Sequence, residues 1–102
     1  MFGGNTICRR VIVSVHAHDQ MVMRNISRKE MLLVLANGDI IETYPRDPRG
    51  PSHLVLGYVG GRPFHVCVGV ADAPDVCVVI TAYEPHPDLW EGDYRTRKGA
   101  RA

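Results

Sequence analysis

The first half of the chain repeats its apolar residues with the spacing of a helix. In the segment 16–25, Ala17, Met21 and Arg24 lie at i, i+4 and i+7 and therefore share one face. Ser14 precedes this segment and can accept hydrogen bonds from the first free amides of a helix. We therefore predict a short amphipathic helix over His16–Asn25.

A second helix is indicated by a capping box and the apolar run that follows it. The Ser27 hydroxyl can accept from the Glu30 amide, while the Glu30 carboxylate can accept from the Ser27 amide. The run 31–36 is apolar throughout, and Gly38 offers a left-handed stop. The pattern predicts a helix over about Arg28–Asn37.

After Gly38 the apolar residues alternate, which is typical of strands. The predicted strands are Asp39–Tyr44, His53–Val59, Pro63–Val70 and Val76–Tyr83. The β-branched run within Ile7–Val15 favours an additional N-terminal edge strand. We expect an α+β fold, in which two N-terminal helices pack on a four-stranded antiparallel meander, with the edge strand as an optional addition.

Composition narrows the class of protein without identifying it. The chain has 102 residues, of which 45% are hydrophobic, so we expect one domain over 1–102 with loose ends at 1–6 and 95–102. A solvated surface is the expected state of the basic tail, while Trp90 should pack against the body. The net charge of +1 argues against a dedicated nucleic-acid coat protein but allows a local basic patch.

Three cysteines, an odd number without a CxxC pair, argue against a disulfide framework and against a structural zinc site. The cysteines are Cys8, Cys67 and Cys77; the last two lie within apolar runs, so we expect them to be buried thiols in a reducing cytoplasm. The sequence contains no apolar stretch of the roughly 20 residues that span a bilayer. It also shows no signal peptide, so no membrane partner is expected.

Polar residues on the strands supply the candidate chemistry. By alternation His65 shares a face with Cys67, Thr81 shares one with Tyr83, and Glu42 shares one with Tyr44. If these faces coincide, they combine a histidine, a carboxylate and a phenol, which suits acid–base catalysis near neutral pH. The alternative is structural: His65 is a hydrogen-bonded, half-buried residue and Tyr83 caps the core.

Other interpretations of the polar residues stay open at this point. Arg24 and Arg62 could bind phosphate, because guanidinium forms paired hydrogen bonds with it. His16, His65 and Glu42 could hold a metal ion if the fold brings them together. His16 and His18 are two residues apart and cannot form a helical metal pair. We find no phosphate-binding loop, dinucleotide motif or nucleophile elbow, and we expect no cofactor.

The chain also resembles a family of small uncharacterised bacterial proteins over about Val13 to Trp90. The matching motifs are His16-Ala17, Arg24-Asn25-Ile26-Ser27, Gly38-Asp39-Ile40-Ile41-Glu42-Thr43-Tyr44-Pro45, Phe64-His65-Val66 and Ile80-Thr81-Ala82-Tyr83. Asn25 stands where that family commonly has glycine, and Phe64 where it has leucine. Members are often encoded beside zinc-finger antitoxins, and their element order is similar to that of the RelE and MqsR messenger-RNA interferases.

This resemblance implies the toxin of a toxin–antitoxin module, acting in the cytoplasm as a metal-independent endoribonuclease on messenger RNA. Its partners would be RNA, free or ribosome-bound, and a cognate antitoxin; the oligomeric state stays open. The expected catalytic residues are His65, Tyr83, Glu42 and His16, and the expected substrate-binding residues are Arg24, Arg62, Tyr44 and Thr81. The alternative is a non-catalytic protein-interaction module that uses the same sheet face or an edge strand.

Overall fold

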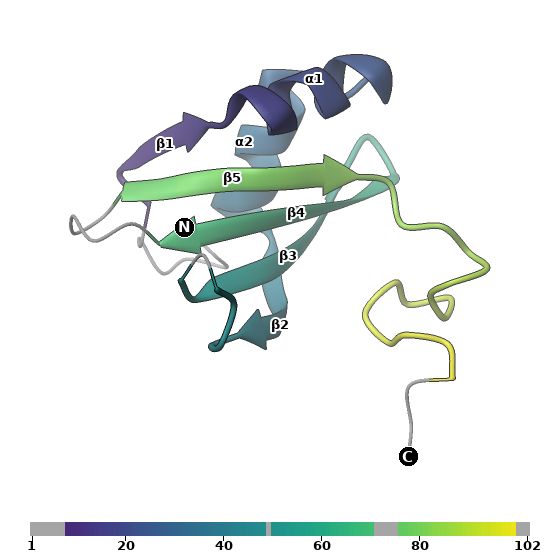
Figure 1. The fold of residues 1–102 in the computed structure, drawn as a ribbon. Coiled ribbons are helices and arrows are strands. Elements are labelled where there is room, and N and C mark those ends of the chain that lie inside the picture. Colours follow the sequence, from purple (N-terminus) through teal and green to yellow (C-terminus); the bar gives the residue numbers. More distant parts are fainter. Residues whose placement is uncertain (1–7, 49, 71–75, 100–102) are drawn as a thin grey trace.

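A computed structural model describes residues 8–48, 50–70 and 76–99 of the chain (Figure 1). In chain order the elements are β1 (Arg10–Val13), α1 (Val15–Met23), α2 (Arg28–Asn37), β2 (Asp39–Tyr44), β3 (Ser52–Val59), β4 (Arg62–Val70) and β5 (Val76–Tyr83). Both helices pack on the same side of the sheet (Figure 1). Within the described ranges, no helix is long and apolar enough to cross a membrane.

The sheet is mixed and has five strands, in the order β1-β5-β4-β3-β2. The predicted four-stranded antiparallel meander is therefore wrong as a fold class. β1 is an integral strand of the sheet and runs parallel to β5, pairing Arg10 with Val76 and Val13 with Val79. Such a pairing joins segments more than 60 residues apart, and apolar periodicity within one segment carries no information about it.

Local signals place the helices correctly. The Ser14 side chain accepts from the Ala17 amide, and both hydrogen bonds of the Ser27–Glu30 capping box are present. Gly38 does end α2, but the expected left-handed stop is wrong, because its φ is −82°. A Cβ at Gly38 would lie 2.5 Å from the carbonyl oxygens of both Val34 and Leu56, so close packing requires glycine there.

Apolar residues fill both sides of the sheet. The main core lies between the helices and the sheet, where Met31 and Leu35 meet Phe64 and Val66. A smaller cluster on the opposite side joins Leu54 and Cys67 to Trp90. Trp90 is only 3% exposed, which confirms that it fixes the C-terminal segment to the body.

Cys8 and Cys77 form a disulfide, so the expectation of a buried thiol at Cys77 is wrong. Cys8 lies two residues before β1, and the register of β1 with β5 pairs Val11 with Cys77. The parallel pairing thus brings together two cysteines that are 69 residues apart in sequence. Cys67 is buried and is not part of the disulfide.

Candidate functional site

Residues 84–99, which we call the strap, cover the side of the sheet opposite the helices. The chain leaves β5 and turns down past the sheet toward β2 (Figure 1). The strap forms its own hydrogen bonds, from the Glu91 amide to the Thr96 carbonyl and from the Lys98 amide to the Leu89 carbonyl. It is therefore a small folded unit, and residues 95–99 make ordered contacts although the sequence suggested a loose end.

His65 lies beneath the strap and has no exposed surface. Its Nε2 is 2.7 Å from the carbonyl oxygen of Tyr94, and its Nδ1 is 3.3 Å from the hydroxyl oxygen of Tyr83. A carbonyl oxygen only accepts, so Nε2 carries the proton. In the neutral ring Nδ1 is then an acceptor, and the Tyr83 hydroxyl donates to it.

The packing around His65 makes its protonation unfavourable. The ring meets Trp90 edge to face, with centroids 4.4 Å apart. Burial lowers the pKa of His65 below 6.5, although the hydrogen bond to Tyr94 and the charge of Glu42 oppose this shift. Burial also raises the pKa of Tyr83. The pair is thus held neutral, in an acid–base arrangement that the strap closes.

Glu42, Tyr44 and Arg97 form the outer part of the same site. Arg97 donates from Nε and Nη2 to the two carboxylate oxygens of Glu42, at 2.9 and 3.0 Å, and the Tyr44 hydroxyl also donates to Glu42. The Arg97 guanidinium lies 4.6 Å from the centre of the Trp90 ring. Arg97 is therefore hydrogen-bonded through its edge and stacked through its face.

These contacts set the pKa values of the outer group. Burial would raise the pKa of Glu42, but hydrogen bonds from Arg97 and Tyr44 outweigh it and lower the pKa below 4.5. Burial and the hydrogen bond to Glu42 raise the pKa of Tyr44 to about 12. The hydrogen bonds to Glu42 raise the pKa of Arg97. The site thus holds one carboxylate and one guanidinium at neutral pH.

A register shift brings Tyr83 onto the face of His65. Unbroken alternation along β5 would put Tyr83 and Thr81 on the same face as Cys77 and Val79, but the strand is not regular. The β4–β5 register shifts at Cys67/Val68, where Cys67 pairs with Thr81 but Val68 pairs with Val79. The extra residue changes the alternation, so Cys77 and Val79 belong to the helix-side core while Tyr83 lies opposite His65.

Arg24 and Thr81 lie at the edge of β5, beyond the end of β1. Arg24 Nη1 is 2.9 Å from the Ala82 carbonyl oxygen and 3.3 Å from Thr81 Oγ1. The Thr81 hydroxyl also donates to Gln20 of α1. The charge of Arg24 acts on Tyr83, opposing the rise in its pKa. The fold thus gathers six of the eight predicted residues near the face of His65 and Tyr83.

The other two predicted residues lie elsewhere. Arg62 forms ion pairs with Glu30 of α2 and with Glu84, which places it on the helix side of the sheet. His16 is exposed on α1 and lines a surface pocket with Asp19 and Met23. No group of three metal-ligating side chains occurs among the described residues, so the alternative metal site does not form there.

The site also contains three residues of the strap that the sequence did not identify as functional: Trp90, Tyr94 and Arg97. The isolated tryptophan was the one available signal, since it indicated packing of the tail. The basic composition of the tail pointed instead to a solvated surface. The role of Tyr94 rests on its backbone carbonyl, which carries no signal in the sequence.

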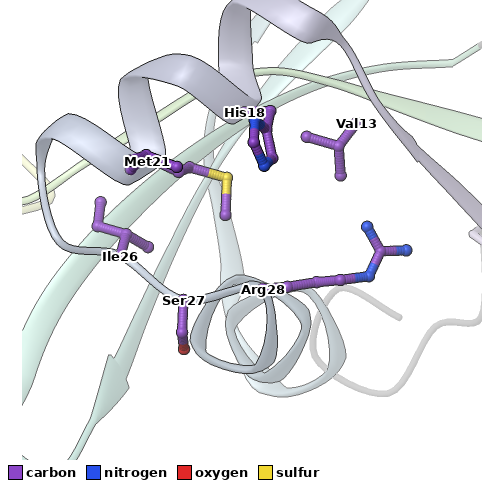
Figure 2. A pocket seen from close by; sticks show the side chains of 7 residues that line it. Val13, His18, Met21, Ile26, Ser27 and Arg28 are labelled. Atoms are coloured by element: carbon purple, nitrogen blue, oxygen red, sulfur yellow. The ribbon is translucent and has the colours of Figure 1, made fainter.

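A separate pocket of about 290 Å³ lies between α1, β1 and the start of α2 (Figure 2). Its apolar wall includes Val13, Met21 and Ile26, and the side chains of His18 and Arg28 add polar groups at its edge. Nearby on α1, Val22 is 67% exposed.

Comparison with known proteins identifies the family. The family described as a domain of unknown function (DUF4258) matches residues 13–84, which is more than half of the chain. The chain belongs to the DUF4258 family. No curated protein and no solved structure matches the chain. The DUF4258 match ends at the start of the strap, so His65, Tyr83 and Glu42 lie within the family domain while Trp90 and Arg97 lie beyond it.

Proposed function

We propose that this DUF4258 protein is the toxin of a toxin–antitoxin module and cleaves single-stranded messenger RNA without a metal ion. The observation that supports this proposal most strongly is the direct contact between His65 and Tyr83 on the sheet face opposite the helices. Glu42 acts on the same histidine through its charge. An imidazole, a phenol and a carboxylate are sufficient for general acid–base catalysis.

In the proposed reaction His65 acts as the general base. Once Tyr94 withdraws, the ring can adopt the other neutral tautomer, in which Nδ1 donates to Tyr83 and Nε2 is a free acceptor. Nε2 then takes the proton of a ribose 2′-hydroxyl, whose oxygen attacks the adjacent phosphate. A 2′,3′-cyclic phosphate forms, the bond to the 5′-oxygen breaks, and the leaving oxygen takes a proton from the imidazolium or from Tyr83. The charges of Arg97 and Arg24 both act on Tyr83, and Arg24, which lies outside the strap, stays in place to stabilise the developing negative charge once the strap is lifted.

The proposal requires a movement of the strap, because His65 is fully buried. The two contacts that close the site, Tyr94 with His65 and Arg97 with Glu42, both lie in residues 91–99. Lifting this part frees Nε2 while Trp90 can stay in its apolar cluster. Lifting breaks the ion pairs with Glu42 and Asp39, the contact of Arg97 with the Trp90 ring and the hydrogen bond from the Lys98 amide to the Leu89 carbonyl, so bound RNA has to compensate for these contacts.

The test is cleavage of a short single-stranded RNA by the full chain in the presence of a chelator. We expect products that end in 2′,3′-cyclic phosphate. Replacing His65→Ala and Tyr83→Phe together should lower the rate at least about 100-fold, the usual contribution of acid–base catalysis. His53→Ala, a histidine of β3 outside this site, serves as the matched control. Undiminished cleavage by the double variant would remove the assigned site.

A cytoplasmic location belongs to the same proposal, since messenger RNA and an antitoxin are found there. The Cys8–Cys77 disulfide argues in the opposite direction, because the cytoplasm keeps most thiols reduced. The proposal therefore requires that the protein folds with both thiols reduced. Mass spectrometry of the protein, alkylated on isolation from the cytoplasm, would show the two thiols; a fully oxidised pair would contradict the location.

The second candidate is a non-catalytic interaction module. It is favoured by the apolar surface beside α1, where Val15 is 78% and Met23 is 85% exposed (Figure 2 shows the adjacent pocket). An antitoxin or another protein partner could cover these side chains. Expression in bacteria separates the two candidates: a toxin arrests growth, whereas a module that binds no RNA leaves growth unchanged.

A further inference from the structure

We infer that Glu42 and Trp90 form a binding site for a guanine base, and that Arg97 occupies this site in the free protein. Arg97 presents two parallel N–H groups to the two oxygens of Glu42. Its planar guanidinium also stacks on the indole of Trp90. Only the choice of RNA as the source of the guanine rests on the proposed function.

Guanine satisfies both contacts with the same geometry. Its Watson–Crick edge carries two neighbouring donors, N1–H and the N2 amino group, which match the two oxygens of a carboxylate. Its ring face can stack on an indole, as unpaired bases do on aromatic side chains. Adenine and cytosine present an acceptor beside the amino donor, and uracil presents acceptors around a single donor. Each of these bases would therefore leave one Glu42 oxygen facing an acceptor.

The state of Glu42 suits a ligand that only donates. Burial would raise its pKa, but the hydrogen bonds from Arg97 and Tyr44 lower it, so a ligand that replaces Arg97 has to offer donors in the same places. Tyr44 donates to the Oε1 atom and orients the group. The Glu42 side chain is 23% exposed and the Arg97 side chain 48%, so the guanidinium can leave without disturbing the core. The indole surface that Arg97 covers then becomes available.

Displacing Arg97 breaks its paired hydrogen bonds with Glu42 and its contact with the Trp90 ring. A guanine base replaces both contacts, and water solvates the guanidinium that is released. Removal of Arg97 by mutation should therefore strengthen guanine binding by up to about fivefold, since the competing group is gone. If Arg97 instead bound the phosphate of the nucleotide, its removal would weaken binding. Tighter or weaker GMP binding by Arg97→Ala therefore shows whether Arg97 competes with the base or binds the phosphate.

The experiment titrates the full-length protein with nucleoside 5′-monophosphates and follows Trp90, the only tryptophan in the chain. We expect GMP to quench its fluorescence, IMP to bind about tenfold more weakly because it lacks the N2 amino group, and AMP to bind more weakly still. Arg97→Ala should bind GMP more tightly, while the control Arg10→Ala should behave as the parent does, because Arg10 is an exposed residue of β1, at the opposite edge of the sheet from β2.

Glu42→Gln should abolish the preference for GMP over IMP, because its amide places a donor against the guanine donors. Equal binding of GMP and AMP by the parent, no binding of GMP, or weaker GMP binding by Arg97→Ala would each overturn the inference. The comparison of GMP, IMP and AMP uses the unsubstituted protein, so its outcome does not depend on whether any variant folds.

A second series distinguishes the source of the base and the two proposals. It uses 2′-O-methyl RNA oligomers, which cannot be cleaved, with a single guanosine or inosine. Binding of GMP but not of the oligomer would identify free nucleotide as the ligand. RNA cleavage without any preference for guanine would overturn the guanine site and leave the nuclease standing. Binding with a preference for guanine but without cleavage of ordinary RNA would overturn the nuclease and leave the guanine site standing.

Discussion

At the scale of single residues, burial determines how the site responds to pH. His65 has no exposed surface and its pKa lies below 6.5, so the folded protein resists its protonation. The same burial explains why sequence analysis located the residue but not its state. Alternation along β4 placed His65 on the correct face, whereas the strap that closes over it comes from a distant segment.

We expect the free energy of unfolding to fall as the pH drops below 6.5. Above that value the ring is neutral in both states; below it the unfolded chain binds a proton that the folded chain does not. The loss continues down to the folded-state pKa and then levels off. Urea unfolding between pH 7.5 and 5.5 measures the slope.

Two variants assign this slope to its residue. His65→Gln keeps polar atoms at the position but does not titrate, so its slope should be smaller than that of the parent. His18→Gln, which changes a side chain that is 68% exposed, should retain the slope of the parent. An unchanged slope in His65→Gln would show that other groups cause it.

At the scale of elements, the sequence was sufficient to predict the helices and most of the strands, but not how distant segments pair with one another. Capping residues predicted both helices because a cap acts within a few residues of its own helix. Alternation predicted four strands for the same reason. The parallel partner of β5, the shifted registers at Ile41 and Ile80, and the Cys8–Cys77 pairing all depend on contacts between distant segments. No single-segment pattern contains them.

The junction between α2 and β2 gives a prediction about packing. Gly38→Ala should lower the free energy of unfolding by about 1–3 kcal/mol, because the new methyl group would overlap the Val34 and Leu56 carbonyl oxygens. Gly92→Ala is the control, since a Cβ there meets nothing within 4 Å, and its effect should stay within about 0.5 kcal/mol. Equal effects in chemical denaturation would contradict the close approach at Gly38.

At the scale of the whole molecule, β1 is held to the body by its pairing with β5 and by one disulfide. The Cys8–Cys77 bond closes a loop of 69 residues in sequence separation, which includes both helices and β2 to β4. A cross-link over so long a loop restricts the unfolded chain strongly. The sheet and the core should nevertheless fold without it, because most of their contacts do not involve the two cysteines.

Reduction should therefore lower the free energy of unfolding by about 2–4 kcal/mol without unfolding the protein. Denaturant titrations with and without a thiol reductant measure the difference. Cys67→Ala should show the same difference, because Cys67 is not part of the disulfide. A stability that does not respond to confirmed reduction would show that the bond contributes little.

The most direct measurement of the whole account follows the His65 imidazole by NMR while a guanosine-containing 2′-O-methyl RNA is added to the full chain. We expect bound RNA to displace Tyr94, so that the Nε2 hydrogen bond is lost and the pKa of His65 rises toward 6.5 as water reaches the ring. A protein saturated with RNA whose His65 signal and pKa do not change would contradict the proposed nuclease site beneath the strap.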